Sequence, residues 1–312
     1  MNLAIALILG TLCTGAGEGD AAERKAVAYL AAEVPRWARE NRCYSCHNNG
    51  DAARALFRAK AAGLAFDESA IRDTLVWLSR PEGWDKNGAD GPISDKRLAR
   101  IEFTLALATA VETGSASHRE ALRRSADRLA ADQGVDGSWP IEDEALGSPA
   151  TYGRRLATAL SARVLEQVDV DRYAGSITRA RYWVRSGRTA GVIDAAAILF
   201  SEPAAGKVGP DGPARKALEF LRSSQATSGG WGPYPDRPTE PFDTALALLA
   251  LEPYRREHAL AAASTRGRAA LVAMQRPDGS WPETTRPPGG ESYAQRLSTT
   301  GWATLALIAS RP

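Results

Sequence analysis

Two cysteines and a histidine form the segment of this chain with the clearest capacity for chemistry. Cys43, Cys46 and His47 lie in the sequence CYSCH, which has the form Cys-x-x-Cys-His. Two thiols at this spacing add to the two vinyl groups on one edge of a porphyrin, and the histidine that follows reaches the iron as an axial ligand. The motif therefore predicts one covalently bound haem c.

Two other chemistries use the same residue types. A thioredoxin-type disulfide between Cys43 and Cys46 normally lies at a helix start within a βαβ pattern, which the sequence lacks. A structural zinc site needs a fourth ligand and usually a second Cys/His pair. The remaining histidines are His118 and His258, and no cysteine follows Cys46. Both alternatives stay open, with haem as the main prediction.

Met274 is the candidate for a second axial ligand of the haem iron. It is the only methionine after Met1 and directly precedes Gln275. A His/Met pair raises the reduction potential and suits electron transfer. The competing interpretation is a flexible side chain that fills a gap in the core. We expect His118 and His258 at the opposite end of the fold, out of reach of the iron.

An internal repeat organises most of the chain. In three segments a helical pattern leads into a Gln, and a Trp follows six residues later after a glycine-containing turn. The pairs are Gln133/Trp139, Gln225/Trp231 and Gln275/Trp281. After each Trp comes a loop and then a helix rich in alanine and leucine, which is apolar nearly all round and must be buried.

The spacing predicts three further units. A degenerate one covers residues 181–200, another surrounds Trp84, and the first covers residues 25–62. Six helical hairpins that close on themselves place six buried helices inside six outer ones. The predicted fold is therefore an all-α (α/α)6 toroid. Turns with positive φ are expected at the repeat glycines Gly137, Gly229, Gly230 and Gly279.

The repeat pattern resembles the QW repeat of squalene–hopene and oxidosqualene cyclases, a group that also includes the β-subunits of protein prenyltransferases. The resemblance covers about residues 65–312 and implies a toroid with a central cavity often used for hydrophobic substrates. The cyclases protonate squalene with an Asp-x-Asp-Asp motif, whereas the nearest match here is Asp169-Val170-Asp171-Arg172. The zinc ligands of protein prenyltransferases are also missing, and a fold alone does not imply an activity.

The N-terminus and the composition bear on the compartment and the partners. Residues 3–12 form an apolar run too short to span a bilayer but suited to a secretory signal peptide over residues 1–19. A lipid anchor at Cys13 is the lesser alternative. Export to the periplasm agrees with haem c, and the surroundings of CYSCH also resemble exported bacterial proteins that join such a motif to a toroid. Residues 20–64 form the first hairpin and residues 65–312 the rest of one continuous domain.

The overall charge excludes some partners. With 39 basic and 37 acidic residues the net charge is +2, so no basic field favours nucleic acid. No transmembrane segment is predicted.

Charged residues recur where the inner helices are expected to begin. They are Arg100, Arg155, Asp194, Asp243 and Arg296. Together they are candidates for the mouth of the central cavity, where arginines pair with haem propionates or another anion. The competing interpretation is structural: arginines tie down loops, and aspartates cap helices.

The main functional hypothesis is an exported c-type haem protein that acts in electron transfer with a partner protein and holds a small or hydrophobic molecule in its cavity. Under this hypothesis, the protein could be a haem-dependent oxidoreductase. One alternative is a non-catalytic toroid that binds a ligand or protein. Another is a terpenoid cyclase whose acid lies at an unrecognised position.

Overall fold

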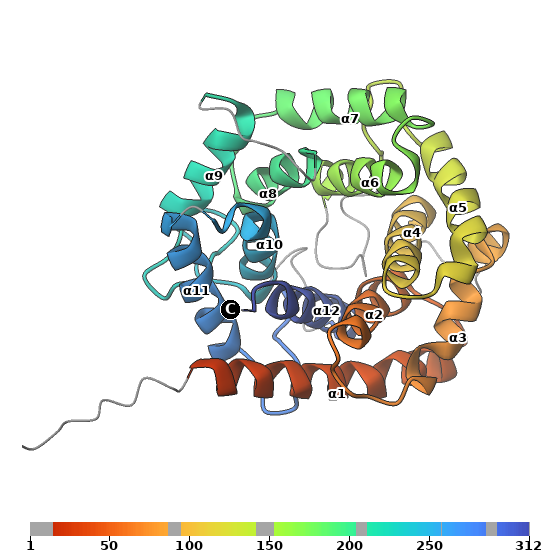
Figure 1. Ribbon diagram of the computed structural model, residues 1–312, viewed down its shortest axis with the longest axis horizontal. Coiled ribbons are helices and arrows are strands. Elements are labelled where there is room, and N and C mark those ends of the chain that lie inside the picture. The colour runs from red at the N-terminus through yellow and green to blue at the C-terminus, as the bar shows by residue number, and fades with distance from the viewer. Residues whose placement is uncertain are drawn as a thin grey trace, which may run out of the picture.

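The computed structural model describes residues 15–86, 95–141, 153–203, 211–256, 258–284 and 292–311. Within these ranges twelve α-helices alternate between two concentric rings, and no residue lies in a strand (Figure 1). The outer ring consists of α1 (Gly15–Asn41), α3 (Ser69–Leu78), α5 (Arg119–Ala131), α7 (Ala174–Ser186), α9 (Pro213–Ser223) and α11 (His258–Ala273). The inner ring consists of α2 (Ala53–Ala61), α4 (Lys96–Glu112), α6 (Gly153–Asp169), α8 (Val192–Ser201), α10 (Pro241–Leu251) and α12 (Tyr293–Ala309). The predicted all-α (α/α)6 toroid is confirmed.

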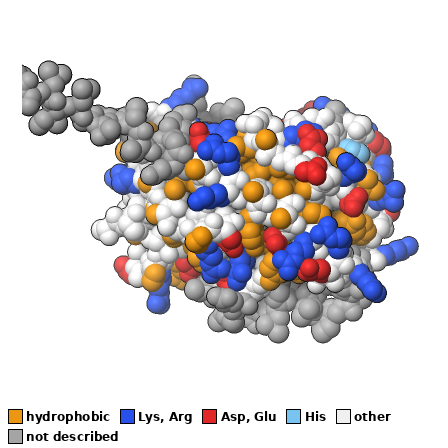
Figure 2. All heavy atoms as spheres, turned by 90° about the horizontal axis from the view of Figure 1, so that it is seen from below, with side chains coloured by type: hydrophobic (Ala, Val, Ile, Leu, Met, Phe, Trp, Pro, Cys, Tyr) orange, Lys and Arg blue, Asp and Glu red, His pale blue; other side chains and the backbone are white. Residues whose placement is uncertain are grey.

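The distribution of apolar residues explains the two rings. Helix α10 is buried along nearly its whole length, as its sequence PFDTALALLAL requires. Helix α9 buries only one stripe, which includes Leu218 and Leu221, and exposes charged residues on its other side. Seen from the side of α1, the outer surface carries mixed acidic and basic side chains around central hydrophobic ones (Figure 2).

Each repeat tryptophan fastens its own hairpin. The indole Nε1 donates to the carbonyl oxygen ten residues earlier, as in the 2.8 Å bond from Trp139 to Leu129. Its backbone N–H donates to a threonine hydroxyl on the following inner helix, which for Trp139 is Thr158 at 3.0 Å. The other two repeats have the same bonds. Each Trp is fully buried.

Each repeat glutamine ties its hairpin to the next one. The Nε2 of Gln133 donates to Gly137 in its own turn and to Ser176 on α7, both at 2.9 Å. A Cβ added to Gly137, whose φ is 92°, would lie 2.8 Å from the Arg179 oxygen, so only glycine fits there. Gly229 and Gly279 also have positive φ, whereas Gly230 does not, and that prediction was wrong.

Removal of the Gln133 amide is expected to destabilise the toroid. Gln133→Ala leaves two partly buried carbonyl groups without their donor and lowers the free energy of unfolding by about 2 kcal/mol. Urea denaturation measures the loss. Gln167→Ala is the control because that side chain is exposed and donates only to Glu112. Equal stability of the two variants would contradict the role of Gln133.

The ring closes where the last hairpin meets the first. Gln275 donates to Ala22 on α1 at 2.9 Å, which repeats the link made by Gln133. Beside it, the fully buried Glu23 binds Arg268 on α11 and Arg311 at the C-terminal end. The predicted signal-peptide core at residues 3–12 and Cys13 lie outside the described residues. None of the helices in the described ranges is both long and apolar enough to cross a bilayer.

Candidate functional site

The CYSCH segment begins in the connection that follows α1 and ends in the inner ring. Residues Cys46–Ala52 form a π-helix, η1, that leads into α2 and packs between α4 and α12. A Cβ on Gly50 would lie 2.7 Å from the Cβ of Glu102, and one on Gly301 would lie 2.7 Å from the oxygen of Asp51. These two glycines therefore let three inner helical segments approach closely. Short π-helices are frequent at functional sites.

Polar side chains fix the start of η1. Ser45 is its N-cap: its hydroxyl accepts from the Asn48 N–H at 3.3 Å, and its own N–H donates to Asn49 Oδ1 at 2.9 Å. The Asn48 amide donates to Val34 on α1, and the Asn49 amide donates to Thr74 on α3. The segment is thus held to both neighbouring outer helices.

Two fully buried carboxyl groups lie at this junction. Asp51 belongs to η1 and accepts a hydrogen bond from the Ser298 hydroxyl on α12. Glu102 belongs to α4 and lies against Gly50. Burial raises the pKa of the Cys46 thiol, and the charges of Glu102 and Asp51 add to the rise. Both carboxyl groups therefore act on the same buried thiol.

Several buried polar atoms around η1 have no hydrogen-bond partner among the described residues. They are both ring nitrogens of His47, Asn48 Oδ1, and the indole nitrogens of Trp37 and Trp77. Buried polar atoms in folded proteins are normally paired, so an unpaired group of them indicates a place for water or a ligand. The His47 ring meets Trp37 edge-on, with centroids 4.5 Å apart.

The buried imidazole of His47 predicts acid-sensitive stability. Burial lowers the pKa of His47 from 6.5 to about 3, so below pH 6.5 the unfolded chain binds a proton that the folded chain does not. This residue should lower the free energy of unfolding by about 2 kcal/mol between pH 7 and pH 5. Urea denaturation of the wild type and of His47→Gln at both pH values measures it. The same pH dependence in both proteins would contradict a neutral buried His47.

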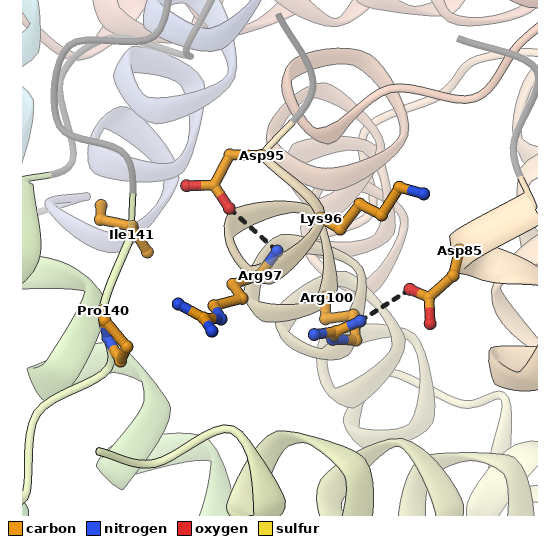
Figure 3. Close-up of a pocket in the computed structure, with 7 residues that line it drawn as sticks. All are labelled: Asp85, Asp95, Lys96, Arg97, Arg100, Pro140 and Ile141. Atoms are coloured by element: carbon orange, nitrogen blue, oxygen red, sulfur yellow. Dashed lines mark hydrogen bonds and ion pairs between the residues drawn. The ribbon is translucent and has the colours of Figure 1, made fainter. Parts of the chain in front are cut away.

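The predicted residues of the cavity mouth are mostly engaged in loop contacts. Arg100 binds Asp85 at 2.8 Å (Figure 3) and Asp132 at 2.7 Å. Arg155 donates to backbone oxygens near the end of α7 and lies 3.2 Å from Asp194.

Asp194, in turn, caps α8 by accepting from Ala190 and Gly191. Arg296 lies 3.4 Å from Glu283. These contacts favour the structural interpretation.

The two other predicted residues lie apart from those loops. Asp243 is fully buried in the first turn of α10. Met274 follows α11 and packs half-buried against the hydrophobic core, and its role as an axial ligand stays a prediction.

Sequence reasoning did not single out Asp51 or Glu102. One signal was present: Glu102 is the only charged residue in the apolar run IEFTLALATAV, and a lone charge in a helix that must be buried indicates a polar site. The Asp-x-Asp-Asp pattern does not include it. Asp169 and Asp171, the nearest match to that pattern, lie at the exposed turn between α6 and α7.

Comparisons with known proteins show what the chain is similar to. No model of a known protein family matches the chain. Drimenyl diphosphate synthase from Streptantibioticus cattleyicolor is 26% identical over 250 residues, which are 73% of this chain and 44% of that enzyme. The chain therefore spans less than half the length of this curated relative.

Two solved structures with a similar fold carry different descriptions. The type II terpene cyclase MstE from Scytonema, in complex with merosterolic acid A, has a TM-score of 0.61 at 15% identity over 96% of this chain and 99% of MstE. A possible member of the GH105 family from Klebsiella pneumoniae has a TM-score of 0.60 at 14% identity over 99% of this chain and 98% of that one.

The chain is a terpenoid-cyclase-like toroid. The prediction of a c-type cytochrome in electron transfer was wrong, because the sequence similarity and the fold lead to terpene cyclases. Within the part of the chain that the structure describes, no three His, Cys, Asp or Glu residues are placed to hold a metal ion. The redox partner predicted with the cytochrome loses its basis.

Covalent attachment of haem c is a separate matter. The unpartnered nitrogens of His47 fit an imidazole that binds a metal, and attachment through Cys43 and Cys46 stays a prediction. Export to the periplasm also stays one.

Proposed function

We propose that this protein is a type II terpene cyclase, which protonates one double bond of a polyprenyl chain and so starts ring closure. The observation that carries the proposal is the pair of buried carboxyl groups, Asp51 and Glu102, where three inner segments meet. The similarity to drimenyl diphosphate synthase supports it. The toroid alone would not decide the reaction, since possible GH105 proteins share it.

The two carboxyl groups have different roles because their surroundings differ. The hydroxyl of Ser298 donates to Asp51 and stabilises its ionised form. Two carboxyl groups that share a buried site disfavour a second negative charge, and we assign the transferable proton to Glu102. Glu102 is then the general acid and Asp51 the group that holds it protonated.

The reaction follows from a proton on Glu102. An alkene π pair takes that proton and forms a C–H bond, which leaves a positive charge on the neighbouring carbon. Further double bonds attack this cation and close the rings. Loss of a proton from carbon ends the sequence, and a proton returned to the Glu102 carboxylate completes the cycle.

Aromatic rings near the carboxyl groups suit the cations formed on the way. Trp77 stacks on Tyr44 at 4.6 Å and meets the edge of Phe103, which directly follows Glu102, at 6.2 Å. The face of an aromatic ring attracts a positive charge. Tyr44 and Trp77, which are half-buried, also provide apolar surface for a hydrocarbon chain.

Incubation with a panel of substrates tests the proposed function. Farnesyl diphosphate, geranylgeranyl diphosphate and squalene are supplied separately in H2O and in D2O, and the products are analysed by mass spectrometry. We expect a cyclic isomer of at least one substrate, with deuterium incorporated from D2O at the protonated carbon. Recovery of all three substrates unchanged by the folded protein would contradict the proposal.

A further inference from the structure

We propose that Arg54 and Arg163, two arginines of the inner ring, together bind a free oxyanion with two negative charges, such as phosphate or sulfate. Arg54 belongs to α2 and Arg163 to α6. Neither side chain makes an ion pair or a hydrogen bond with any residue that the structure describes. This site is separate from the buried carboxyl groups and does not depend on the proposed cyclisation.

The helix faces that carry the two arginines converge over α4. In the inner ring α4 lies between α2 and α6 (Figure 1). The Glu112 carboxylate at the end of α4 accepts from Arg58 of α2 at 2.9 Å and from Gln167 of α6 at 3.2 Å. Arg54 lies four residues before Arg58 on α2. Arg163 lies four residues before Gln167 on α6. Because residues four apart share one face of a helix, both arginines lie about one turn inward from Glu112 and on the same side of it.

The two guanidinium groups act on each other through their charges. Water reaches the side chain of Arg163, which is exposed, but the neighbouring inner helices surround it. The loss of bulk water lowers the pKa of Arg163, and the positive charge of Arg54 lowers it further. Two positive charges in a poorly hydrated space repel each other, and an anion that contacts both offsets the repulsion.

The acidic groups that act on Arg163 already bind other arginines. Glu112 binds Arg58 at 2.9 Å, and Glu166 binds Arg181 at 2.8 Å. Both carboxylates raise the pKa of Arg163, but not enough to offset the lowering. Within the described residues, the ring therefore presents two cations here without a carboxylate of their own.

Aromatic rings position the two guanidinium groups without satisfying their N–H donors. Cζ of Arg54 lies 4.4 Å from the centre of the Trp302 ring. Cζ of Arg163 lies 5.7 Å from the centre of the Phe200 ring. An aromatic face attracts a cation, but it does not replace the hydrogen bonds that the guanidinium made to water. Nη1 of Arg54 is buried and has no hydrogen-bond partner, and such a donor indicates a missing acceptor.

The chemistry of this arginine pair favours an oxyanion over other ligands. The planar donors of a guanidinium match two oxygens of a phosphate or sulfate. Two guanidinium groups together balance the charge of a dianion. A neutral hydrocarbon would remove their remaining water without supplying acceptors, which is unfavourable.

Binding of inorganic phosphate to arginine variants tests this inference. Isothermal titration of the whole chain at constant ionic strength measures the Kd of phosphate and of sulfate for the wild type, Arg54→Gln, Arg163→Gln and Arg163→Lys. We expect each glutamine variant to bind both ions at least about tenfold more weakly, with partial recovery in Arg163→Lys. The control is Arg172→Gln, which should keep the wild-type Kd because Arg172 is exposed and binds Asp127.

Stability provides a second readout that a purely structural arginine would not give. In buffer without phosphate or sulfate, Arg163→Gln removes the repulsion with Arg54, so its thermal midpoint should exceed that of the wild type. Saturating phosphate should raise the midpoint of the wild type but not that of Arg163→Gln. A lower midpoint of Arg163→Gln in the phosphate-free buffer would overturn the inference.

Two further outcomes of the titration decide the proposal. Absence of binding of both ions to the wild type, or the same Kd in the wild type and both glutamine variants, would contradict it. Phosphate that still binds in the presence of excess farnesyl diphosphate supports a separate site for the free ion. Displacement of phosphate by that compound would overturn a separate site.

Discussion

Replacement of Glu102 by glutamine is expected to lower the rate of cyclisation by a factor of about 10² to 10⁴, which is the usual contribution of a general acid. Glutamine has nearly the same shape as a protonated glutamate but no acidic proton. Because the side chain lies against Gly50 in a close helix contact, this near-isosteric change should leave packing intact. Product formation per unit time measures the rate of cyclisation, and the thermal midpoint of unfolding measures whether packing is intact.

Glu112→Gln is the matched control for this experiment. Glu112 lies on the same helix but is exposed at its C-terminal end, where it binds Arg58 at 2.9 Å. Its replacement should leave the rate unchanged. A folded Glu102→Gln protein that retains full activity would exclude Glu102 as the acid. Asp51→Asn would then be the next variant, because the second buried carboxyl group would be the remaining donor at this junction.

Local patterns were sufficient to predict the fold but not the site. The Gln-to-Trp spacing of six residues marks a turn whose hydrogen bonds are almost all local, so three copies fix the period and the closed ring follows. The degenerate fourth unit was still recognised by its apolar helix, which is α8. A helix rich in alanine and leucine on all sides must be covered on all sides, so it belongs in the inner ring.

The site depends on contacts between segments far apart in the chain. Asp51 accepts a hydrogen bond from Ser298, which lies 247 positions later in the chain. Glu102 on α4 lies against Gly50 on η1. No spacing rule connects such residues. The five residues of the CYSCH motif are local in the chain, whereas the position of the following η1 segment between α4 and α12 became visible only in the folded chain.

Loss of the Glu23 carboxylate is expected to have the largest effect on stability. Glu23 lies fully buried on α1, where its Oε1 binds Arg268 at 2.7 Å and its Oε2 binds the guanidinium of Arg311. Glu23→Ala leaves two partly buried arginines without their counter-charge, which typically costs about 3–5 kcal/mol. Urea denaturation of the whole chain measures the change in the free energy of unfolding.

The size of that loss reports how the ring is closed. Glu23 joins the first hairpin to residues 245 and 288 positions later, so it links the two ends of the toroid. Glu40→Ala on the same helix is the control, because its pair with Arg36 is exposed and such pairs contribute less than about 1 kcal/mol. If Glu23→Ala were as stable as Glu40→Ala, closure would depend on the apolar contacts of α1 with α11 and α12 and on the Gln275 bond to Ala22. A large loss in the free energy of unfolding for Glu23→Ala alone would show that this carboxylate holds the two ends of the ring together.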